Sequence, residues 1–350
     1  MTCDFPTNPG DMTADWLAVA LGASAGDLTG FDATKVGTGQ MCDSFRLTLY
    51  WAADAAHDLP RSIIAKCPSH DPASRAIAAA VNAYALEVNF YRELADDIAV
   101  PTPKCHFAAM VGDGQDFLLL LADLSPARAG DQLAGGDMAM LQAAIAAAAP
   151  LHAAYWGDAA LEDKAWLARD NRDLLRHHFP PMFAAFRERY AGRLDADCIA
   201  VGEGLVARIE PYLARQAAAR TLVHGDLRVD NILFAPDKGQ CWLVDWQTLG
   251  VGSAAADIAY LIGTSQAAYD ATAERTLFDQ WLAALAAHGV TPDTETLWRE
   301  YRIGALSGYF MAVFASMSVE RTPRGDAMFA VMAQRPARQA LALQSLDLLQ

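Results

Sequence analysis

The sequence predicts a two-lobed α+β fold, in which a strand-rich first third precedes a mainly helical remainder. Its 350 residues are 53% hydrophobic, and this length is typical of two domains or lobes. Strand-like segments gather before residue 122. After 122–126 the chain becomes rich in alanine, a strong helix former. We therefore expect an N-terminal nucleotide-binding lobe at 1–121, a hinge at 122–126 and a helical lobe at 127–350.

The first lobe is expected to consist of short strands and one main helix. Four segments rich in β-branched and aromatic residues are predicted as strands, at 45–51, 62–67, 104–110 and 116–121. Apolar residues spaced by four and three predict a helix over 73–94, and Thr13 caps a short leading helix over 12–21. Gly37 and Gly39 indicate a turn between strands.

The second lobe is expected to be helical, with two short strands in its middle. Its helices are predicted at 137–155, 165–190, 199–218, 256–265, 273–288, 293–317 and 325–348. Strand-like pieces at 221–224 and 240–244 interrupt this series. The sequence contains no internal repeat and no low-complexity linker, so the chain is expected to fold into packed lobes throughout.

Charge and hydropathy argue against several classes of partner. Lys and Arg total 27 against 42 Asp and Glu, which gives a formal net charge of −15. This balance disfavours nucleic acid and anionic membrane surfaces. The apolar runs are far shorter than the ~20 residues that span a bilayer, and the acidic N-terminus does not resemble a secretory signal. We expect a soluble cytoplasmic protein without nucleic-acid or membrane partners; its oligomeric state is not indicated.

Cysteine spacing argues against disulfides and zinc. The six cysteines lie at positions 3, 42, 67, 105, 198 and 241. None of them forms a C-x-x-C pair, so neither a disulfide framework nor a zinc site is predicted. A chain of this size buries enough surface to fold without either.

The most informative segments are LVHGDLRVDNILF at 222–234 and CWLVDWQ at 241–247. In both, apolar residues flank polar groups that lie at the edge of a strand or turn. Asp226 and Asn231 are five residues apart across a loop, and Asp245 follows at the end of a strand. Two carboxylates and a carboxamide supply the hard oxygen ligands that Mg²⁺ prefers. These segments therefore predict a magnesium site.

The same segments resemble a known family. HGDLRVDN followed by VDW is similar to the catalytic loop H-G-D-x-x-x-x-N and the metal-binding Asp of the aminoglycoside phosphotransferase and choline kinase superfamily, relatives of protein kinases. The wider match includes GTGQ, Lys66, Glu87, FLLLLADLSPARAGDQ, LHAAYW and ERTPRGDAMF. These flanking phrases look most like the bacterial ecdysteroid-kinase-like, or CHK-kinase-like, members. The combined order is specific, whereas any single element is not.

The resemblance implies a bilobal protein-kinase-like fold with a five-stranded antiparallel first lobe and nucleotide in the cleft between the lobes. It implies ATP as cofactor, with GTP as an alternative, together with Mg²⁺, and a small-molecule alcohol as acceptor. Aminoglycoside-like, choline-like and apolar or steroid-like alcohols remain open, because the fold does not choose between them. Methionine and aromatic residues within 309–332 either line an acceptor pocket for an apolar alcohol or belong to the core.

The resemblance also implies a role for each matched residue. Phosphoryl transfer needs positioning and positive charge near the moving group. Lys66 would hold the α- and β-phosphates, and Glu87 would hold Lys66. Asn231 and Asp245 would hold the magnesium ions. Asp226 would accept a hydrogen bond from the acceptor hydroxyl, orient it for in-line attack and take its proton late.

Further residues are expected near the nucleotide. Gly37 and Gly39 would form the turn over the phosphates, although GTGQMC lacks the third glycine of G-x-G-x-x-G and no G-K-[ST] follows. Arg228 would touch the γ-phosphate. Backbone groups of the connector after the last strand of the first lobe would contact the adenine, at Leu121, Ala122 and Leu124.

Two alternatives to a kinase remain open. One is a catalytically silent pseudokinase or sensor that binds nucleotide without turnover. The other is a metal-dependent hydrolase built on His224, Asp226, Asp245 and Asp257. We disfavour the hydrolase because only one histidine is near and because Lys66 and Glu87 would have no role. Within the kinase hypothesis, His224 is expected to brace the catalytic loop and Asp257 to tie it down.

Overall fold

The computed structural model describes residues 4–37, 41–56, 58–112, 114–168 and 172–350. The chain divides into two compact units, each assembled from segments distant in sequence. The N-terminal unit comprises Met1–Asp97, Thr102–Ser125 and Asp245–Thr248. The C-terminal unit comprises Ile98–Pro101, Pro126–Val244 and Leu249–Gln350. Each unit therefore receives a short segment from the part of the chain that mainly builds the other.

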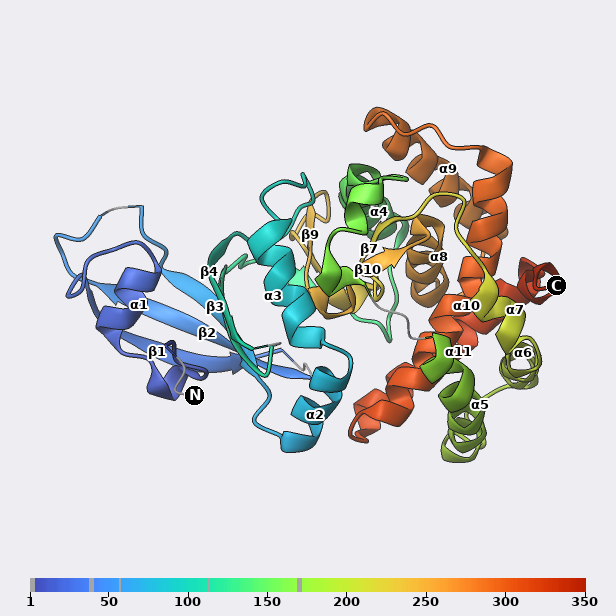
Figure 1. The fold of residues 1–350 in the computed structure, drawn as a ribbon, viewed down its shortest axis with the longest axis horizontal. Coiled ribbons are helices and arrows are strands. Elements are labelled where there is room, and N and C mark those ends of the chain that lie inside the picture. Colours follow the sequence, from blue (N-terminus) through green and yellow to red (C-terminus); the bar gives the residue numbers. More distant parts are fainter. Residues whose placement is uncertain (1–3, 38–40, 57, 113, 169–171) are drawn as a thin grey trace. The chain divides into compact units, whose positions relative to one another are not determined.

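The N-terminal unit is built on a five-stranded antiparallel sheet, as the family resemblance implied, although its first strand was not predicted from the residues. Its order is β1-β2-β3-β5-β4, and the strands lie side by side in Figure 1. The strands are β1 (Leu28–Val36), β2 (Cys42–Trp51), β3 (Ser62–Pro68), β4 (Cys105–Val111) and β5 (Asp116–Ala122). Alternation along the strands puts one set of apolar side chains into a core with α1 (Ala14–Ala20). The expected N-cap is confirmed, because Thr13 accepts from the Trp16 amide at 3.2 Å.

The helix predicted over 73–94 is wrong in one respect, because it is two helices. α2 (Pro72–Ala80) and α3 (Ala83–Glu93) are separated by Asn82, whose backbone is left-handed with φ of 55°. Asparagine is one of the few residues that adopt this conformation readily, and a single such residue ends a helix. The break allows α3 to take its own direction and to bury most of its residues.

The C-terminal unit is mainly helical, as expected. Its helices are α4 (Met138–Ala154), α5 (Arg172–Arg189), α6 (Ala196–Ala207), α7 (Ile209–Ala214), α8 (Ala254–Ser265), α9 (Ala271–Ala287), α10 (Thr294–Ser318) and α11 (Pro323–Ala342). Nearly all of α8 is buried, and it packs against α10 and α11. A Cβ at Gly304 of α10 would lie 2.7 Å from the Ala256 Cα, so glycine is what permits this close approach.

Short strands and 3₁₀ turns complete the C-terminal unit around the catalytic-loop segment. One small sheet pairs β7 (Thr221–Val223) with β10 (Gly250–Gly252), and the other has the order β6-β8-β9, from Arg128–Ala129, Ile232–Phe234 and Cys241–Leu243. Across the described residues of both units, the 3₁₀ turns are η1 (Pro9–Asp11), η2 (Ala159–Leu161), η3 (Ala165–Leu167), η4 (Val229–Asn231), η5 (Trp246–Thr248) and η6 (Ser345–Leu348).

Three predicted helices of this unit differ at their ends. In the segment predicted from 165, Ala165–Leu167 form a 3₁₀ turn, and α5 begins at Arg172. The helix predicted over 199–218 bends at Arg208, whose φ and ψ of −117° and 25° are not helical, and α7 then ends at Ala214. The last helix stops at Ala342, because Gln344 takes a left-handed conformation with φ of 53°.

Two sequence expectations concern the whole described chain. The cysteines within it are free thiols, at Cys42, Cys67, Cys105, Cys198 and Cys241. In the same part of the chain, we find no helix whose length and apolar character would let it traverse a bilayer.

Candidate active site

A buried lysine lies between two carboxylates in the N-terminal unit. The Lys66 Nζ contacts both carboxylate oxygens of Glu87, at 2.8 and 2.6 Å, and the Asp245 Oδ1 at 2.8 Å. Lys66 is 8% exposed and Glu87 is 1% exposed. Folding therefore brings together three predicted site residues that are far apart in sequence.

Local structure explains how each of these side chains is placed. In β3, Lys66 alternates with Ala65 and Cys67, which belong to the core shared with α1, so its side chain points to the opposite face of the sheet. Glu87 lies in the middle of α3 and is fully enclosed. Asp245 has a left-handed backbone with φ of 70°, a strained conformation for a residue other than glycine and one typical of functional sites.

Aromatic packing anchors the segment that carries Asp245. The Trp246 ring stacks on Phe90 of α3, with centroids 3.8 Å apart and an interplanar angle of 17°. Its indole N–H donates to the Thr102 hydroxyl at 3.1 Å, and its backbone N–H donates to Glu87 at 3.4 Å. This anchor was not predicted, although Trp246 directly follows Asp245 in the sequence. Asp245 is therefore directly bonded to a fully buried residue that fixes its position.

The electrostatic balance keeps the lysine charged. Burial alone would lower the pKa of Lys66, but Asp245, Cys42 and Glu87 outweigh burial and raise its pKa well above the ordinary value. Burial raises the pKa of Glu87, and the Lys66 ammonium opposes this effect. One ammonium facing two carboxylates leaves the cluster with spare negative charge, which suits a cation brought by a nucleotide.

A second group of predicted site residues lies in the loop between β7 and β8 of the C-terminal unit. The Asp226 Oδ1 accepts from the Tyr260 hydroxyl at 2.6 Å, and the Oδ2 accepts from the Asn231 Nδ2 at 2.8 Å. The Arg228 Nε donates to both oxygens, at 3.1 and 3.2 Å. The carboxylate predicted to act as the catalytic base is therefore fixed by three side chains.

Helix α8 ties the backbone of this loop down, as the sequence analysis expected of Asp257. Its carboxylate accepts from the amide of His224 at 2.6 Å and from that of Gly225 at 3.0 Å. Gly225 has φ of 80°, a conformation that glycine adopts without strain. The His224 Nε2 is 3.0 Å from the Val244 carbonyl oxygen, which agrees with the expected bracing role.

Asn231 in the C-terminal unit and Asp245 in the N-terminal unit each carry an oxygen of the kind that Mg²⁺ prefers. The Asn231 Nδ2 donates to the backbone oxygen of Asp226 at 2.9 Å as well as to its carboxylate. This orientation of the amide leaves its Oδ1 as a hard oxygen ligand, and the Asp245 carboxylate is 38% exposed. The described residues hold no group of three or more His, Cys, Asp and Glu suited to a metal. Mg²⁺ needs no such group, because phosphates and water complete its shell.

Arg228 is occupied by carboxylates. Besides Asp226, its guanidinium donates from Nη1 to the Asp230 Oδ2 at 2.7 Å, and it lies 3.8 Å from the Met328 sulfur. Burial opposes its charge, but Asp226, Tyr260 and Asp230 together raise its pKa above the ordinary value. The geometry thus gives Arg228 the task of holding the loop carboxylates.

The connector expected to contact adenine is held by a residue that the sequence analysis missed. Leu121 and Ala122 end β5, and Leu124 follows Asp123. The Asp123 carboxylate accepts from the Arg46 Nε at 2.7 Å and from the hydroxyls of Ser62 and Ser125 at 2.8 Å. The sequence feature that could have indicated this role is the position of Asp123, an acid directly after an apolar strand.

The glycine turn is only partly described. Gly37 has φ of 75°, and a Cβ at this position would meet no atom within 4 Å. The left-handed backbone, and not close packing, is what favours glycine there. Gly39 lies outside the described residues.

Replacing Asp123 with Asn is expected to lower the free energy of unfolding at neutral pH by about 2 kcal/mol, because a charged hydrogen-bond acceptor is lost. Burial raises the pKa of Asp123, but bonds from Arg46, Ser125 and Ser62 outweigh it, so its folded pKa lies below the ordinary value. Its contribution is therefore present above about pH 4 and is lost as the pH falls below that value. Urea unfolding from pH 7 to pH 3 should show the difference between the two proteins shrinking; a constant difference contradicts the assignment.

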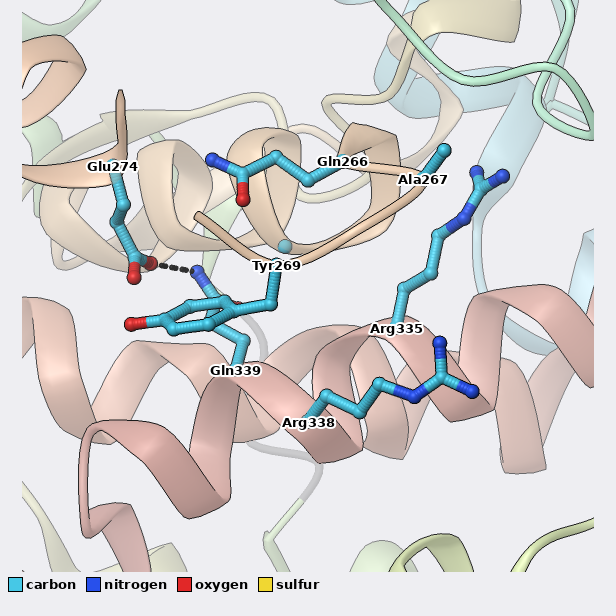
Figure 2. A pocket seen from close by; sticks show the side chains of 8 residues that line it. Gln266, Ala267, Tyr269, Glu274, Arg335, Arg338 and Gln339 are labelled. Atoms are coloured by element: carbon cyan, nitrogen blue, oxygen red, sulfur yellow. Dashed lines mark hydrogen bonds between the residues drawn. The ribbon is translucent and has the colours of Figure 1, made fainter. Parts of the chain in front are cut away.

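A small cavity lies elsewhere in the C-terminal unit. Figure 2 shows it between the end of α8, the start of α9 and α11, with the Gln339 amide donating to Glu274 at 2.6 Å. Arg335 and Arg338 also line it. Its volume of ≈ 10 Å³ is close to the space of one water molecule. None of the predicted site residues lines this cavity.

The sequence of this chain matches a family profile and part of one curated protein. The profile of the phosphotransferase enzyme family (APH) matches residues 71–301. Among curated proteins, a stretch of 59 residues is 42% identical to acyl-CoA dehydrogenase family member 10 of Mus musculus. That stretch is 17% of this chain and 5% of the mouse protein, so the chain matches only a small part of that relative.

Solved structures share the fold. An ethanolamine kinase of Plasmodium vivax has a TM-score of 0.53 at 10% identity, over 91% of this chain and 83% of that one. A macrolide 2′-phosphotransferase type I has a TM-score of 0.51 at 17% identity, over 90% and 94% of the two chains. A microcompartment-associated aminopropanol kinase has a TM-score of 0.50 at 13% identity, over 92% and 94%. These likenesses confirm the kinase-like fold that the sequence predicted.

Proposed function

Because the chain belongs to the phosphotransferase enzyme family, we propose that it transfers the γ-phosphoryl group of ATP to a hydroxyl group of a small molecule. Family membership confirms the expected class of enzyme, a small-molecule kinase, and the resemblance to aminoglycoside phosphotransferases and choline kinases. The closer likeness to ecdysteroid-kinase-like proteins stays a prediction. The observation that supports the proposal most strongly is the buried ammonium of Lys66 paired with Glu87 and Asp245.

In this proposal Lys66 binds the α- and β-phosphates. Glu87 holds the ammonium in place from behind, since both of its oxygens contact the Nζ. A fixed positive charge is what a phosphoryl group requires as it moves through a loose transition state. Backbone groups at Leu121, Ala122 and Leu124 bind the adenine, and a guanine base remains the alternative for the same connector.

Asn231 and Asp245 are the residues that would hold Mg²⁺. Both present hard oxygen atoms, and the amide orientation of Asn231 is set by Asp226. When bound with the nucleotide, the ion neutralises charge on the phosphate oxygens. The strained backbone of Asp245 fits this role, because strain of this kind is retained where a side chain must point in one direction.

Asp226 orients the acceptor and receives its proton. Its carboxylate accepts a hydrogen bond from the acceptor hydroxyl, whose oxygen attacks the γ-phosphorus while the bond to the leaving nucleotide oxygen breaks. The hydroxyl proton passes to Asp226 late in the transfer. Arg228 keeps the carboxylate aligned and balances its charge.

The acceptor class stays open, because the apolar residues of α10 and α11 differ in how far they are buried. Tyr309, Phe310, Phe329 and Met332 are buried in the core, whereas Met311, Phe314, Met317 and Met328 are half-buried. The half-buried set favours an alcohol with an apolar part. Aminoglycoside-like and choline-like acceptors remain candidates. We place the reaction in the cytoplasm, since free thiols are typical of a reducing compartment.

A transfer assay tests the proposal. The purified protein is incubated with Mg-ATP or Mg-GTP and an aminoglycoside, a macrolide, choline, ethanolamine, 1-amino-2-propanol or a steroid alcohol, and products are followed by phosphorus NMR. We expect one class of alcohol to become a phosphate monoester, with release of ADP or GDP. Thermal stabilisation by nucleotide without transfer to any alcohol would instead support a silent nucleotide-binding scaffold.

A further inference from the structure

Tyr260 touches the proposed catalytic carboxylate directly, and neither the sequence analysis nor the family motif points to it. Its hydroxyl donates to the Asp226 Oδ1 at 2.6 Å, and the residue is 3% exposed. It lies in α8, three residues after Asp257, which holds the backbone of the same loop. Residues three apart share one face of a helix. One face of α8 therefore fixes both the backbone and the side chain of the loop.

We infer that Tyr260 is a positioning residue for phosphoryl transfer, which holds the Asp226 carboxylate in the rotation that meets the acceptor hydroxyl. This inference rests on the proposed role of Asp226 as the base. The Arg228 Nε lies almost equally far from the two carboxylate oxygens and does not distinguish them.

Two other donors give the carboxylate a unique orientation. Of the two Asp226 carboxylate oxygens, the Asn231 Nδ2 donates to Oδ2 and the Tyr260 hydroxyl donates to Oδ1. Without the phenol, Oδ1 keeps only the Arg228 contact among these three donors, and the carboxylate is held less firmly against rotation about its Cβ–Cγ bond. Because each oxygen has two lone pairs, one on Oδ1 is still available for the acceptor after Tyr260 has bound.

The tyrosine is itself held rigidly by two neighbouring helices. A Cβ at Gly308 of α10 would lie 3.0 Å from the Tyr260 Cδ2 and 2.8 Å from the Pro336 Cγ. The ring therefore packs closely against α10, and the glycine makes room for it. Burial and the nearby Asp226 raise the pKa of Tyr260 well above its ordinary value, so its hydroxyl keeps the proton that it donates.

Tyr260→Phe removes only the hydroxyl. With Mg-ATP and the fastest acceptor from the assay above, we expect kcat to fall by about 10- to 100-fold, the size expected for a charge-assisted hydrogen bond. The KM for ATP should change by less than about twofold, because Lys66 and Asp245 are untouched. This split between kcat and KM separates positioning from a general loss of folded protein.

Tyr301→Phe is the matched control. Tyr301 is fully buried in α10 and donates to the Glu274 carboxylate at 2.8 Å, so it loses the same kind of bond outside the loop. We expect its thermal midpoint to fall about as much as that of Tyr260→Phe, with kcat unchanged. Equal kcat values for the two variants overturn the inference.

Gly308→Ala is a second, independent variant. It keeps the hydroxyl but presses on the ring, so kcat should fall while the KM for ATP stays constant. Gly204→Ala in α6, whose Cβ meets the Leu346 side chain and not Tyr260 or its neighbours in α8, is its control. If wild-type protein phosphorylates an alcohol and both Tyr260→Phe and Gly308→Ala match its kcat, the inference alone fails. If wild-type protein phosphorylates none of the alcohols, the proposed function fails and the inference falls with it.

Discussion

Asp226→Asn is expected to lower kcat by about 10²- to 10⁴-fold, the range that a positioned acid or base contributes. The substitution keeps the size of the side chain, but its amide group faces donors that Asp226 now satisfies, namely Tyr260, Arg228 and Asn231. Nucleotide affinity should persist, because the lysine cluster is unchanged. Steady-state kinetics and thermal shift with Mg-ATP measure the two quantities separately.

Asp230→Asn is the control for this change. Asp230 belongs to the same loop and also pairs with Arg228, but it accepts from the amide of Gln132 at 2.9 Å, whereas Asn231 and Tyr260 donate to Asp226. We expect a much smaller loss of kcat. An Asp226→Asn variant that transfers phosphate as fast as wild-type protein contradicts the proposed base, whereas a silent scaffold would show no rate to lose in either form.

Lys66→Gln should have the second largest effect, on both ATP use and stability. The change leaves the Glu87 and Asp245 carboxylates without their cation, and breaking a buried ion pair from one side costs about 3–5 kcal/mol. The KM for ATP should rise and kcat/KM should fall by about 10²-fold or more, since the loss of one fixed charge at the phosphates costs several kcal/mol. Urea unfolding and ATP titration measure these effects.

A double variant separates the two consequences. In Lys66→Gln with Glu87→Gln, the buried unpaired carboxylate is gone, so part of the stability should return while ATP use stays low. Lys104→Gln, at an exposed lysine of the same unit, should change the free energy of unfolding by less than about 0.5 kcal/mol. A Lys66→Gln protein as stable as Lys104→Gln, with normal use of ATP, would show that the ion pairs have neither role.

Much of the candidate site was predictable because its residues stand in a short, ordered pattern. The loop HGDLRVDN and the Asp after the next strand fix the types and order of the polar groups. The apolar strands around them determine where the chain turns. Four strands of the sheet were predicted from their β-branched and aromatic residues, whereas the five-stranded antiparallel sheet was implied by the family resemblance, and the structure confirms it.

What was not predictable depends on contacts between distant residues. The spacing of apolar residues continues across Asn82, so this spacing does not reveal that one backbone angle splits the helix. Tyr260 looks like any buried aromatic residue of α8 until its hydroxyl is seen beside Asp226. Periodic spacing likewise cannot separate the buried Tyr309 from the half-buried Phe314, because both lie on α10.

The segment Asp245–Thr248 determines when the first unit can be completed during synthesis. Trp246 fills a fully buried place against Phe90, yet it is made more than a hundred residues after the strands it supports. At a synthesis rate of about 5–20 residues per second, the nascent first unit lacks Trp246 against Phe90 for several seconds. A fragment that stops at Ser125 should therefore be recovered as an aggregate or as a loosely packed species. Adding the missing tetrapeptide as a separate molecule should not restore the fold, because a free peptide loses more conformational entropy on binding than the same segment does within the chain.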